Sequence, residues 1–320
     1  MFGKIPLPSA RASSGREVLL LPFLRLIGAV VLSWITAFSG AHAADFRISF
    51  EVNERMRSAI ISQPRRLKHV PRATIIVLHG SENGARIRRR LGLDAMVASA
   101  GYATVYPYAI AEHWHNGLEP ALGAPDDVVY LRTLIKRLAL SGITDPRRVF
   151  IVGVSAGGIM ALRFACEAGE MVSGTVAILA NMPASLAECK LPKPLPFLLI
   201  NGTADPEIPY TGGATALKNR TGSVLSTEAT MSIFAKAANC VGDRSTKQFD
   251  DKDKDDKTTA FRETYSHCTI PVELIRIEGG GHTLPGKNKG IGPSENAGAS
   301  NRDVESNKLI WEFIRNLPRN

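Results

Sequence analysis

Short apolar runs alternate with amphipathic segments along most of this 320-residue chain, and that alternation restricts its fold more than any other feature. Residues 73–78 (ATIIVL) and 148–154 (RVFIVGV) have the apolar character of strands that are buried on both faces of a sheet. Between them, residues 126–140 place apolar side chains at close to the helical period, and the leading Asp126 and Asp127 suit a helix N-terminus. Strands that alternate with helices predict a mostly parallel sheet with helices on both faces.

The same reading along the chain gives one continuous series of elements, with no internal repeat and no linker rich in Pro, Gly or Ser. We expect strands at 73–78, 103–106, 148–154, 176–179, 196–200 and 272–277, and helices at 91–99, 126–140, 156–167, 226–238 and 304–313. Hydrophobic residues make up 44% of the chain and charged residues 22%, as in ordinary globular proteins. The sequence therefore predicts one α/β domain with its core at about 73–316.

The first 43 residues differ from the rest of the chain. Basic residues are scattered through 1–25, an apolar run follows at 26–38, and Ala41-His42-Ala43 has the small-x-small form of a cleavage site. The apolar run is shorter than the roughly twenty residues that span a bilayer, which disfavours a membrane anchor. We therefore predict a signal peptide at 1–43, a mature chain at 44–320 with no stable anchor after cleavage, and a secreted or periplasmic location.

All four cysteines lie in the predicted mature chain. An even number of cysteines in an exported protein indicates disulfide bonds, and four cysteines allow three pairings. We favour Cys166–Cys189 and Cys240–Cys268 because each pair closes a short loop, which the chain-entropy model values at about 3 kcal/mol. No CxxC motif occurs, so we expect no metal site at the cysteines.

Two runs of charge interrupt the pattern. Residues 250–257 (DDKDKDDK) are interpreted as a solvated loop, since they lack the fixed glycine and the terminal glutamate of a calcium-binding loop. Arg86 and residues 88–90 fit a solvated helix start better than a surface for an anionic polymer. The formal net charge is +9, but no recognised nucleic-acid-binding module is present, so nucleic acid is not an expected partner.

The chemistry centres on a serine in the motif Gly153-Val154-Ser155-Ala156-Gly157. As a bare G-x-S-x-G pattern it is weak, but here an apolar strand precedes it and an Ala/Gly-rich helix follows it. The sharp strand-to-helix turn needs close packing, which the two glycines permit, and it lifts the serine hydroxyl above the sheet. It also points the backbone N–H of Ala156 at a developing oxyanion. We predict Ser155 as a nucleophile and Ala156 as an oxyanion-hole residue.

A serine nucleophile needs a base and an orienting acid, which follow it in the order acid, then histidine, in this type of site. Of the two histidines after Ser155, His282 directly follows the last predicted strand and three glycines, whereas His267 precedes that strand. Asp205 follows the strand at 196–200, where its carboxylate can orient the imidazole, and Glu207 is the alternative acid. The predicted triad is therefore Ser155, His282 and Asp205.

Further site residues are expected on the loops that follow the earlier strands. Ser81 follows His79-Gly80 at the end of the first long strand, so its N–H is the expected second oxyanion donor. Trp114 is a candidate substrate-binding residue on the wall of a cleft, although packing of a long loop explains it equally well. His113 and His115 flank this tryptophan but lack a third ligand nearby, so no metal is expected there.

Six motifs spread over 73–316 are shared with a known family: LHG at 78–80, VYP at 105–107, DPRRV at 145–149, GVSAGG at 153–158, NGTADPEIPY at 201–210 and GGGHTLPG at 279–286. With them the chain resembles the secreted α/β-hydrolase family of poly(3-hydroxybutyrate) depolymerases and feruloyl or acetylxylan esterases. The resemblance implies the α/β-hydrolase fold, the triad named above and a Cys240–Cys268 disulfide. Leu284 stands where the family often has tryptophan, so we take it as a second candidate substrate-binding residue.

The resemblance implies a serine carboxylic-ester hydrolase that works through an acyl-enzyme without a cofactor. The expected substrates are poly(3-hydroxybutyrate) esters or oligomers, and the absence of a separate binding domain favours soluble oligomers over crystalline polymer. Feruloyl or acetyl esters of plant polysaccharides are the alternative substrates. A serine peptidase of the same fold is less favoured, because no gating domain fits before residue 73, and a catalytically dead binding protein is disfavoured because all three triad positions are filled.

Overall fold

The computed structural model describes residues 43–64, 71–119, 126–217, 222–286 and 297–318. Contacts within the chain separate Met1–Ser39 from Gly40–Asn320, and the second segment forms one compact unit. The predicted signal peptide lies outside the described residues except for Ala43, with which the first strand begins. Within the described part, no helix is long and apolar enough to cross a membrane.

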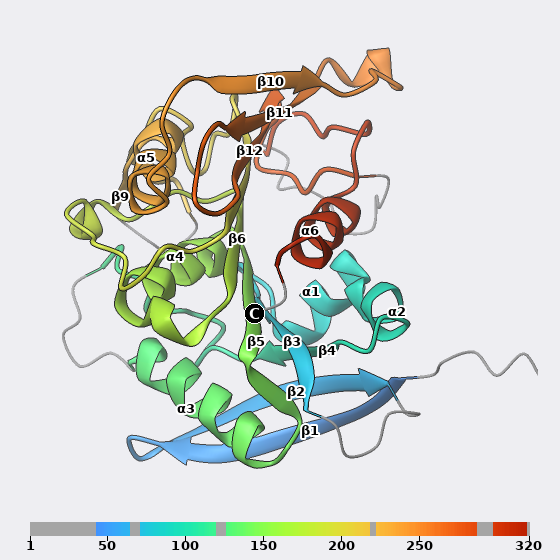
Figure 1. Ribbon diagram of the computed structural model, residues 1–320, viewed down its shortest axis with the longest axis vertical. Helices are drawn as coiled ribbons and strands as arrows, with labels where there is room; N and C mark the ends of the chain where they lie inside the picture. Colours follow the sequence, from blue (N-terminus) through green and yellow to red (C-terminus); the bar gives the residue numbers. More distant parts are fainter. Residues whose placement is uncertain (1–42, 65–70, 120–125, 218–221, 287–296, 319–320) are drawn as a thin grey trace, which may run out of the picture. The chain divides into compact units, whose positions relative to one another are not determined.

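A ten-stranded sheet runs through the compact unit in the order β1-β2-β4-β3-β5-β6-β7-β12-β11-β10 (Figure 1). The six central strands are parallel to one another, and the two strands at each edge are antiparallel. The central strands are β4 (Ala103–Pro107), β3 (Arg72–Leu78), β5 (Thr144–Val154), β6 (Gly174–Ile178), β7 (Phe197–Gly202) and β12 (Val272–Glu278). All six expected strands are therefore present, and the predicted mostly parallel α/β sheet is confirmed.

Helices cover both faces of this sheet (Figure 1). One face carries α1 (Gly84–Leu91), α2 (Leu93–Ala98) and α6 (Ser306–Arg315). The other carries α3 (Asp127–Leu140), α4 (Ala156–Ala168) and α5 (Thr227–Ala237). Short 3-10 turns lie at Gly169–Met171, Ala184–Leu186 and Lys254–Asp256, and a two-stranded ribbon joins β8 (Gly213–Ala214) to β9 (Ser223–Val224).

The alternation of side chains along each central strand divides the core into two layers. In β3, Ile76 and Leu78 point into the layer under α3, α4 and α5, whereas Ile75 and Val77 point into the layer under α1, α2 and α6. All four side chains are fully buried. Burial of one such side chain stabilises the fold by about 1.5–3 kcal/mol, which is why a strand buried on both faces is apolar throughout.

The N-terminal hairpin was not predicted from the sequence. Strands β1 (Ala43–Val52) and β2 (Arg55–Pro64) pair with each other, and β2 adds antiparallel to β4. A buried ion pair between Arg57 and Asp127 ties the hairpin to α3, and the guanidinium of Arg57 lies 3.8 Å from the ring centroid of Tyr130. The hairpin thus extends the sheet beyond the 73–316 core expected from the sequence.

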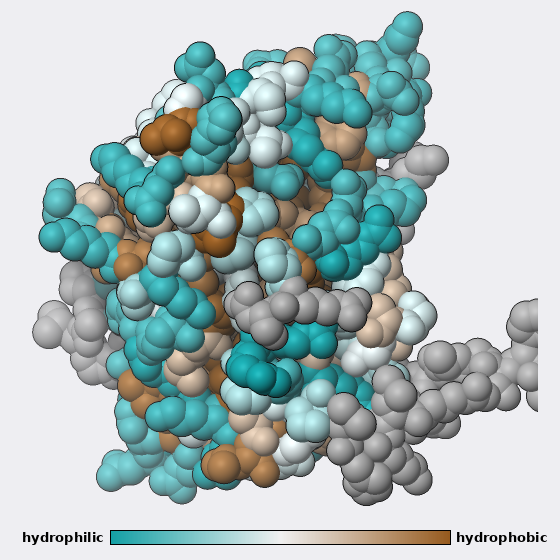
Figure 2. Space-filling view, viewed as in Figure 1, coloured by the Kyte–Doolittle hydropathy of each residue, from teal (hydrophilic) through white to brown (hydrophobic). Residues whose placement is uncertain are grey.

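The two charged runs have structural roles. The four arginines lie in α1, where Arg88 pairs with Asp45 at 2.6 Å and also with Asp94, so the run belongs to a helix that is anchored to the hairpin. The acidic loop 250–257 links β10 (Arg244–Gln248) to β11 (Thr259–Tyr265) and is largely exposed, as expected. Its backbone is held by Asp303, which accepts a 2.7 Å hydrogen bond from the amide of Lys252. Hydrophilic residues cover this end of the molecule (Figure 2).

The structure contains the two disulfides that loop length favoured. Cys166 at the end of α4 joins Cys189, and Cys240 after α5 joins Cys268 ahead of β12. No free cysteine remains. The disulfides tie helices on one face of the sheet to neighbouring loops, away from the turn that carries Ser155.

Candidate active site

Ser155 lies at the sharp turn between β5 and α4 with φ 56° and ψ −124°, a strained conformation for a residue with a side chain. The turn is possible because the backbone packs without intervening side chains. A Cβ at Gly153 would lie 2.1 Å from the carbonyl oxygen of Gly157, and a Cβ at Gly157 would lie 2.3 Å from that of His79. The two glycines of the motif are therefore required by contact distance, and they fix the serine at the carboxyl end of the sheet.

Ser155, His282 and Asp205 form one hydrogen-bonded chain. Oγ of Ser155 lies 2.8 Å from Nε2 of His282, and Nδ1 of the same imidazole lies 2.7 Å from Oδ2 of Asp205. Because a carboxylate only accepts hydrogen bonds, Nδ1 carries the proton and Nε2 is left to accept the serine proton. The His282 and Asp205 side chains are 8% and 3% exposed, so little water competes for these bonds.

The loops that carry the acid and the base are fixed by their own backbone bonds. Oδ1 of Asp205 accepts hydrogen bonds of 2.8 Å from the amides of Glu207 and Ile208, which hold the carboxylate just beyond β7. The amide of His282 donates to the carbonyl of Ala297 at 2.6 Å, just beyond β12. His282 therefore reaches Ser155, and Asp205 reaches His282, from the carboxyl ends of neighbouring parallel strands.

Of the two expected oxyanion donors, Ala156 directly follows the serine in the chain, and Ser81 follows a glycine that packs against the serine. Ala156 is the first residue of α4, so its N–H has no acceptor within the helix. Gly80 packs against the serine, since a Cβ placed there would lie 3.1 Å from Cβ of Ser155, and Ser81 follows it. Nδ1 of the buried His79 lies 3.0 Å from the Gly80 carbonyl, and its Nε2 accepts from the amide of Ala109 at 3.1 Å. His79 thus fixes the peptide that carries the Ser81 N–H, as a structural loop residue.

Trp114 does not have the exposed position expected of a substrate-binding residue. Its side chain is 2% exposed, and its indole N–H donates to the carbonyl of His79 at 2.8 Å. Asn116, which was not singled out in the sequence, donates from Nδ2 to the carbonyl of Ala156 at 3.2 Å. Both residues therefore bind backbone carbonyls next to Ser155, those of His79 and Ala156. The structure supports the interpretation of Trp114 as a packing residue. Leu284 is partly buried two residues after His282 and packs on the apolar layer under α6.

Comparison with known proteins agrees with this geometry. A family model described as phospholipase/carboxylesterase matches residues 108–243, which include Ser155 and Asp205. A protein of Nocardia uniformis subsp. tsuyamanensis that is named as an esterase, NocK, is 31% identical over 256 residues, which cover 76% of this chain and 74% of that protein. The chain belongs to this esterase family of α/β-hydrolases. It is thus a serine esterase-type hydrolase.

Two further matches cover different shares of the chain. Feruloyl esterase B of Piromyces equi is 25% identical over 179 residues, which cover 54% of this esterase-family chain but only 31% of that longer protein. The crystal structure of acetyl xylan esterase from Aspergillus awamori superposes with a TM-score of 0.56 at 11% identity, covering 84% of this chain and 99% of that one. The second match therefore shows that the two proteins share a fold.

Glu207, the alternative acid, occupies a different side of the imidazole. One of its carboxylate oxygens lies 3.6 Å from Nε2 of His282, whereas Asp205 holds Nδ1. Glu207 therefore does not contact Nδ1, as Asp205 does, but lies beside Nε2, the atom that faces Oγ of Ser155. Among the described residues no group of three or more His, Cys, Asp or Glu is placed to bind a metal ion.

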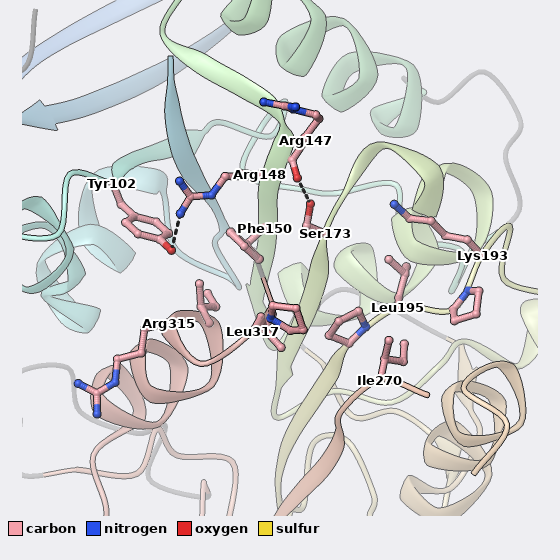
Figure 3. Close-up of a pocket in the computed structure, with 14 residues that line it drawn as sticks. Tyr102, Arg147, Arg148, Phe150, Ser173, Lys193, Leu195, Ile270, Arg315 and Leu317 are labelled. Atoms are coloured by element: carbon pink, nitrogen blue, oxygen red, sulfur yellow. Dashed lines mark hydrogen bonds between the residues drawn. The ribbon is translucent and has the colours of Figure 1, made fainter. Parts of the chain in front are cut away.

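A separate cavity of about 150 Å³ lies near the amino ends of the central strands, whereas Ser155 lies at a carboxyl end (Figure 3). It is lined by residues of β5, by Ser173 just before β6 and by the end of α6, and it includes none of Ser155, His282 and Asp205. Arg148 turns toward the Tyr102 hydroxyl, to which it donates a 3.0 Å hydrogen bond (Figure 3). Burial lowers the pKa of Lys193 on the cavity wall. The cavity therefore lies apart from the candidate active site.

Proposed function

We propose that this esterase is a secreted carboxylic-ester hydrolase in which Ser155 attacks the ester carbonyl, His282 transfers protons and Asp205 orients His282. The observation that carries the proposal is the unbroken chain of 2.8 Å and 2.7 Å contacts from Ser155 through His282 to Asp205. The nucleophile–base–orienter geometry is the arrangement that activates a serine in acyl transfer.

The reaction proceeds in two halves. As Oγ of Ser155 forms a bond to the carbonyl carbon, its proton passes to Nε2 of His282 and the carbonyl oxygen becomes an oxyanion, facing the N–H groups of Ser81 and Ala156. The intermediate collapses, the carbon–alkoxy bond breaks, and the proton moves from Nε2 to the leaving alcohol. Water then gives a proton to Nε2 and attacks the acyl carbon, and the proton returns to Oγ as the acid leaves.

Two ester classes are candidate substrates. Motifs shared with poly(3-hydroxybutyrate) depolymerases, such as NGTADPEIPY at 201–210, support hydroxyalkanoate oligomers. The similarity to feruloyl esterase B favours feruloyl esters, and acetyl esters of polysaccharides belong to the same alternative. Leu284 lies two residues after His282 in the chain, and we expect it to contact the substrate. A serine peptidase activity is less favoured, because the proteins matched in sequence are named as esterases.

Purified residues 44–320, with Ser155→Ala as the control, test this proposal. We expect hydrolysis of 3-hydroxybutyrate oligomers or methyl ferulate, lost in the variant, and no cleavage of peptide anilides. The substrate with the higher kcat/KM decides between the two ester classes. An equal rate in wild type and Ser155→Ala would contradict the proposed nucleophile. The proposed export predicts that the mature protein recovered from the medium or periplasm begins at Ala44, which N-terminal sequencing measures.

A further inference from the structure

The carboxylate of Glu207 lies at the reaction centre, and the triad does not use it. One oxygen is 3.6 Å from Nε2 of His282, and the side chain is 26% exposed, compared with 3% for Asp205. The backbone beneath it is fixed, because the Glu207 amide donates to Asp205 at 2.8 Å and its carbonyl accepts from Ala216 at 2.8 Å. A negative charge is therefore held beside the proton-transferring atom.

The position of Glu207 places its carboxylate close to where the alcohol part of a bound ester would lie. In the proposed reaction, Nε2 of His282 faces Oγ of Ser155 first, then the oxygen of the leaving alcohol, and then the attacking water. A group that lies 3.6 Å from Nε2 is therefore close to the substituents of the leaving alcohol. The buried carboxylate of Asp205 faces Nδ1 on the other side of the ring, where no substrate atom approaches.

We propose that Glu207 determines the charge preference of this site for the leaving alcohol, which rests on the proposed esterase function. Alcohols that carry a cationic ammonium group are favoured by attraction between opposite charges, and a hydroxyl group near the ester oxygen can donate a hydrogen bond to the carboxylate. Alcohols that carry a carboxylate near the ester oxygen are rejected by like-charge repulsion. A 3-hydroxybutyrate oligomer is then cleaved away from its free carboxyl end, since the last ester bond of the chain releases an anionic alcohol.

Two substrate pairs with a constant acetyl group isolate this effect. The anionic pair is 3-acetoxybutyrate and its neutral analogue 3-acetoxybutyramide, and the cationic pair is acetylcholine and its neutral analogue 3,3-dimethylbutyl acetate. Release of acetate gives kcat/KM for wild type, Glu207→Gln and Glu51→Gln. Glu51 is an exposed acid on the N-terminal hairpin, so its variant makes the same change in net charge away from the reaction centre.

We expect wild type to prefer 3-acetoxybutyramide over 3-acetoxybutyrate and acetylcholine over 3,3-dimethylbutyl acetate. Glu207→Gln should reduce each ratio about tenfold, equal to about 1.4 kcal/mol, whereas Glu51→Gln should leave both ratios within twofold of wild type. The proposal is wrong if either ratio in Glu207→Gln stays within twofold of the wild-type value.

A second measurement uses wild type alone and does not depend on the folding of a variant. The amide-to-carboxylate ratio should fall as ionic strength rises from about 0.01 M to about 1 M, since salt screens charges that solvent reaches. An unchanged ratio would overturn the proposal. Failure of the underlying esterase function gives a different result: wild type hydrolyses none of the four esters, or its activity survives Ser155→Ala.

Discussion

The carboxylate of Asp205 lies 2.7 Å from Nδ1 of His282, although the two residues are 77 positions apart in the chain. Their strands, β7 and β12, are adjacent and parallel, so both residues lie at the same edge of the sheet. Asp205 fixes the tautomer in which Nε2 faces Ser155. The topology of the sheet thus determines which proton-transfer chain can form.

Replacement of Asp205 by asparagine should reduce kcat by about 10³–10⁴-fold, because the amide N–H favours the wrong tautomer of His282. The asparagine oxygen can still accept from the amides of Glu207 and Ile208, so the melting temperature should change little. Steady-state kinetics and thermal unfolding of the same preparation check both parts. A fall in kcat of less than tenfold would show that Asp205 does not orient the base.

Gly157→Ala should destabilise the protein by about 3 kcal/mol or more, or prevent folding. The added Cβ would lie 2.3 Å from the carbonyl oxygen of His79 and 2.5 Å from that of Leu78, and backbone atoms cannot move aside as side chains do. Urea unfolding measures the loss. Ser141→Ala at the exposed end of α3 is a control that adds no such contact, and equal stability of the two variants would contradict the close-packing argument.

Arg57→Met should reduce the free energy of unfolding by about 3–5 kcal/mol, since it leaves the charge of Asp127 buried without its partner. The double variant with Arg57→Met and Asp127→Asn should lose less free energy of unfolding than the two single variants lose together. The reason is that the double variant leaves no buried charge without a partner. Arg55→Met, at an exposed position of the same hairpin, should cost under about 0.5 kcal/mol. Additive effects in this cycle would exclude a coupled pair.

Stability should depend on pH through Glu273, because its burial raises the pKa of that carboxyl despite Arg262 at 3.7 Å. Because the carboxyl has a higher pKa in the folded state than in the unfolded state, its contribution to stability is fully present at pH values below the unfolded-state pKa, near 4.3. That contribution is lost as the pH rises through the pKa of the folded state. Glu273→Gln should therefore raise the melting temperature relative to wild type more at pH 7 than at pH 4. The same difference at both pH values would contradict this linkage.

The parallel core and the positions of the triad could be predicted because local signals and global topology agree there. Strands β3, β4, β6 and β7 are buried along their whole length and are largely apolar. The proposed catalytic residues follow the ends of β5, β7 and β12 closely in the chain. With Ser155 as the nucleophile, the acid and the histidine must follow it in that order along the chain. This order leaves few candidate partners.

The edge strands could not be predicted because their pattern is mixed. Residues of β10 are mostly exposed, and β2 buries the charged Arg57, whose partner Asp127 is 70 residues away. A local sequence pattern cannot predict a contact between two residues that are so far apart in the chain. The position of Trp114 could not be predicted either, because its burial depends on the carbonyl of His79, to which it donates a hydrogen bond.

Covalent labelling of the mature chain with a fluorophosphonate tests directly whether Ser155 is the nucleophile. We expect one added phosphonyl group per chain, located by peptide mass spectrometry on Ser155 and abolished in Ser155→Ala and in His282→Ala. Labelling on another residue, or labelling that persists in Ser155→Ala, would contradict the assignment of Ser155 as the nucleophile of this esterase.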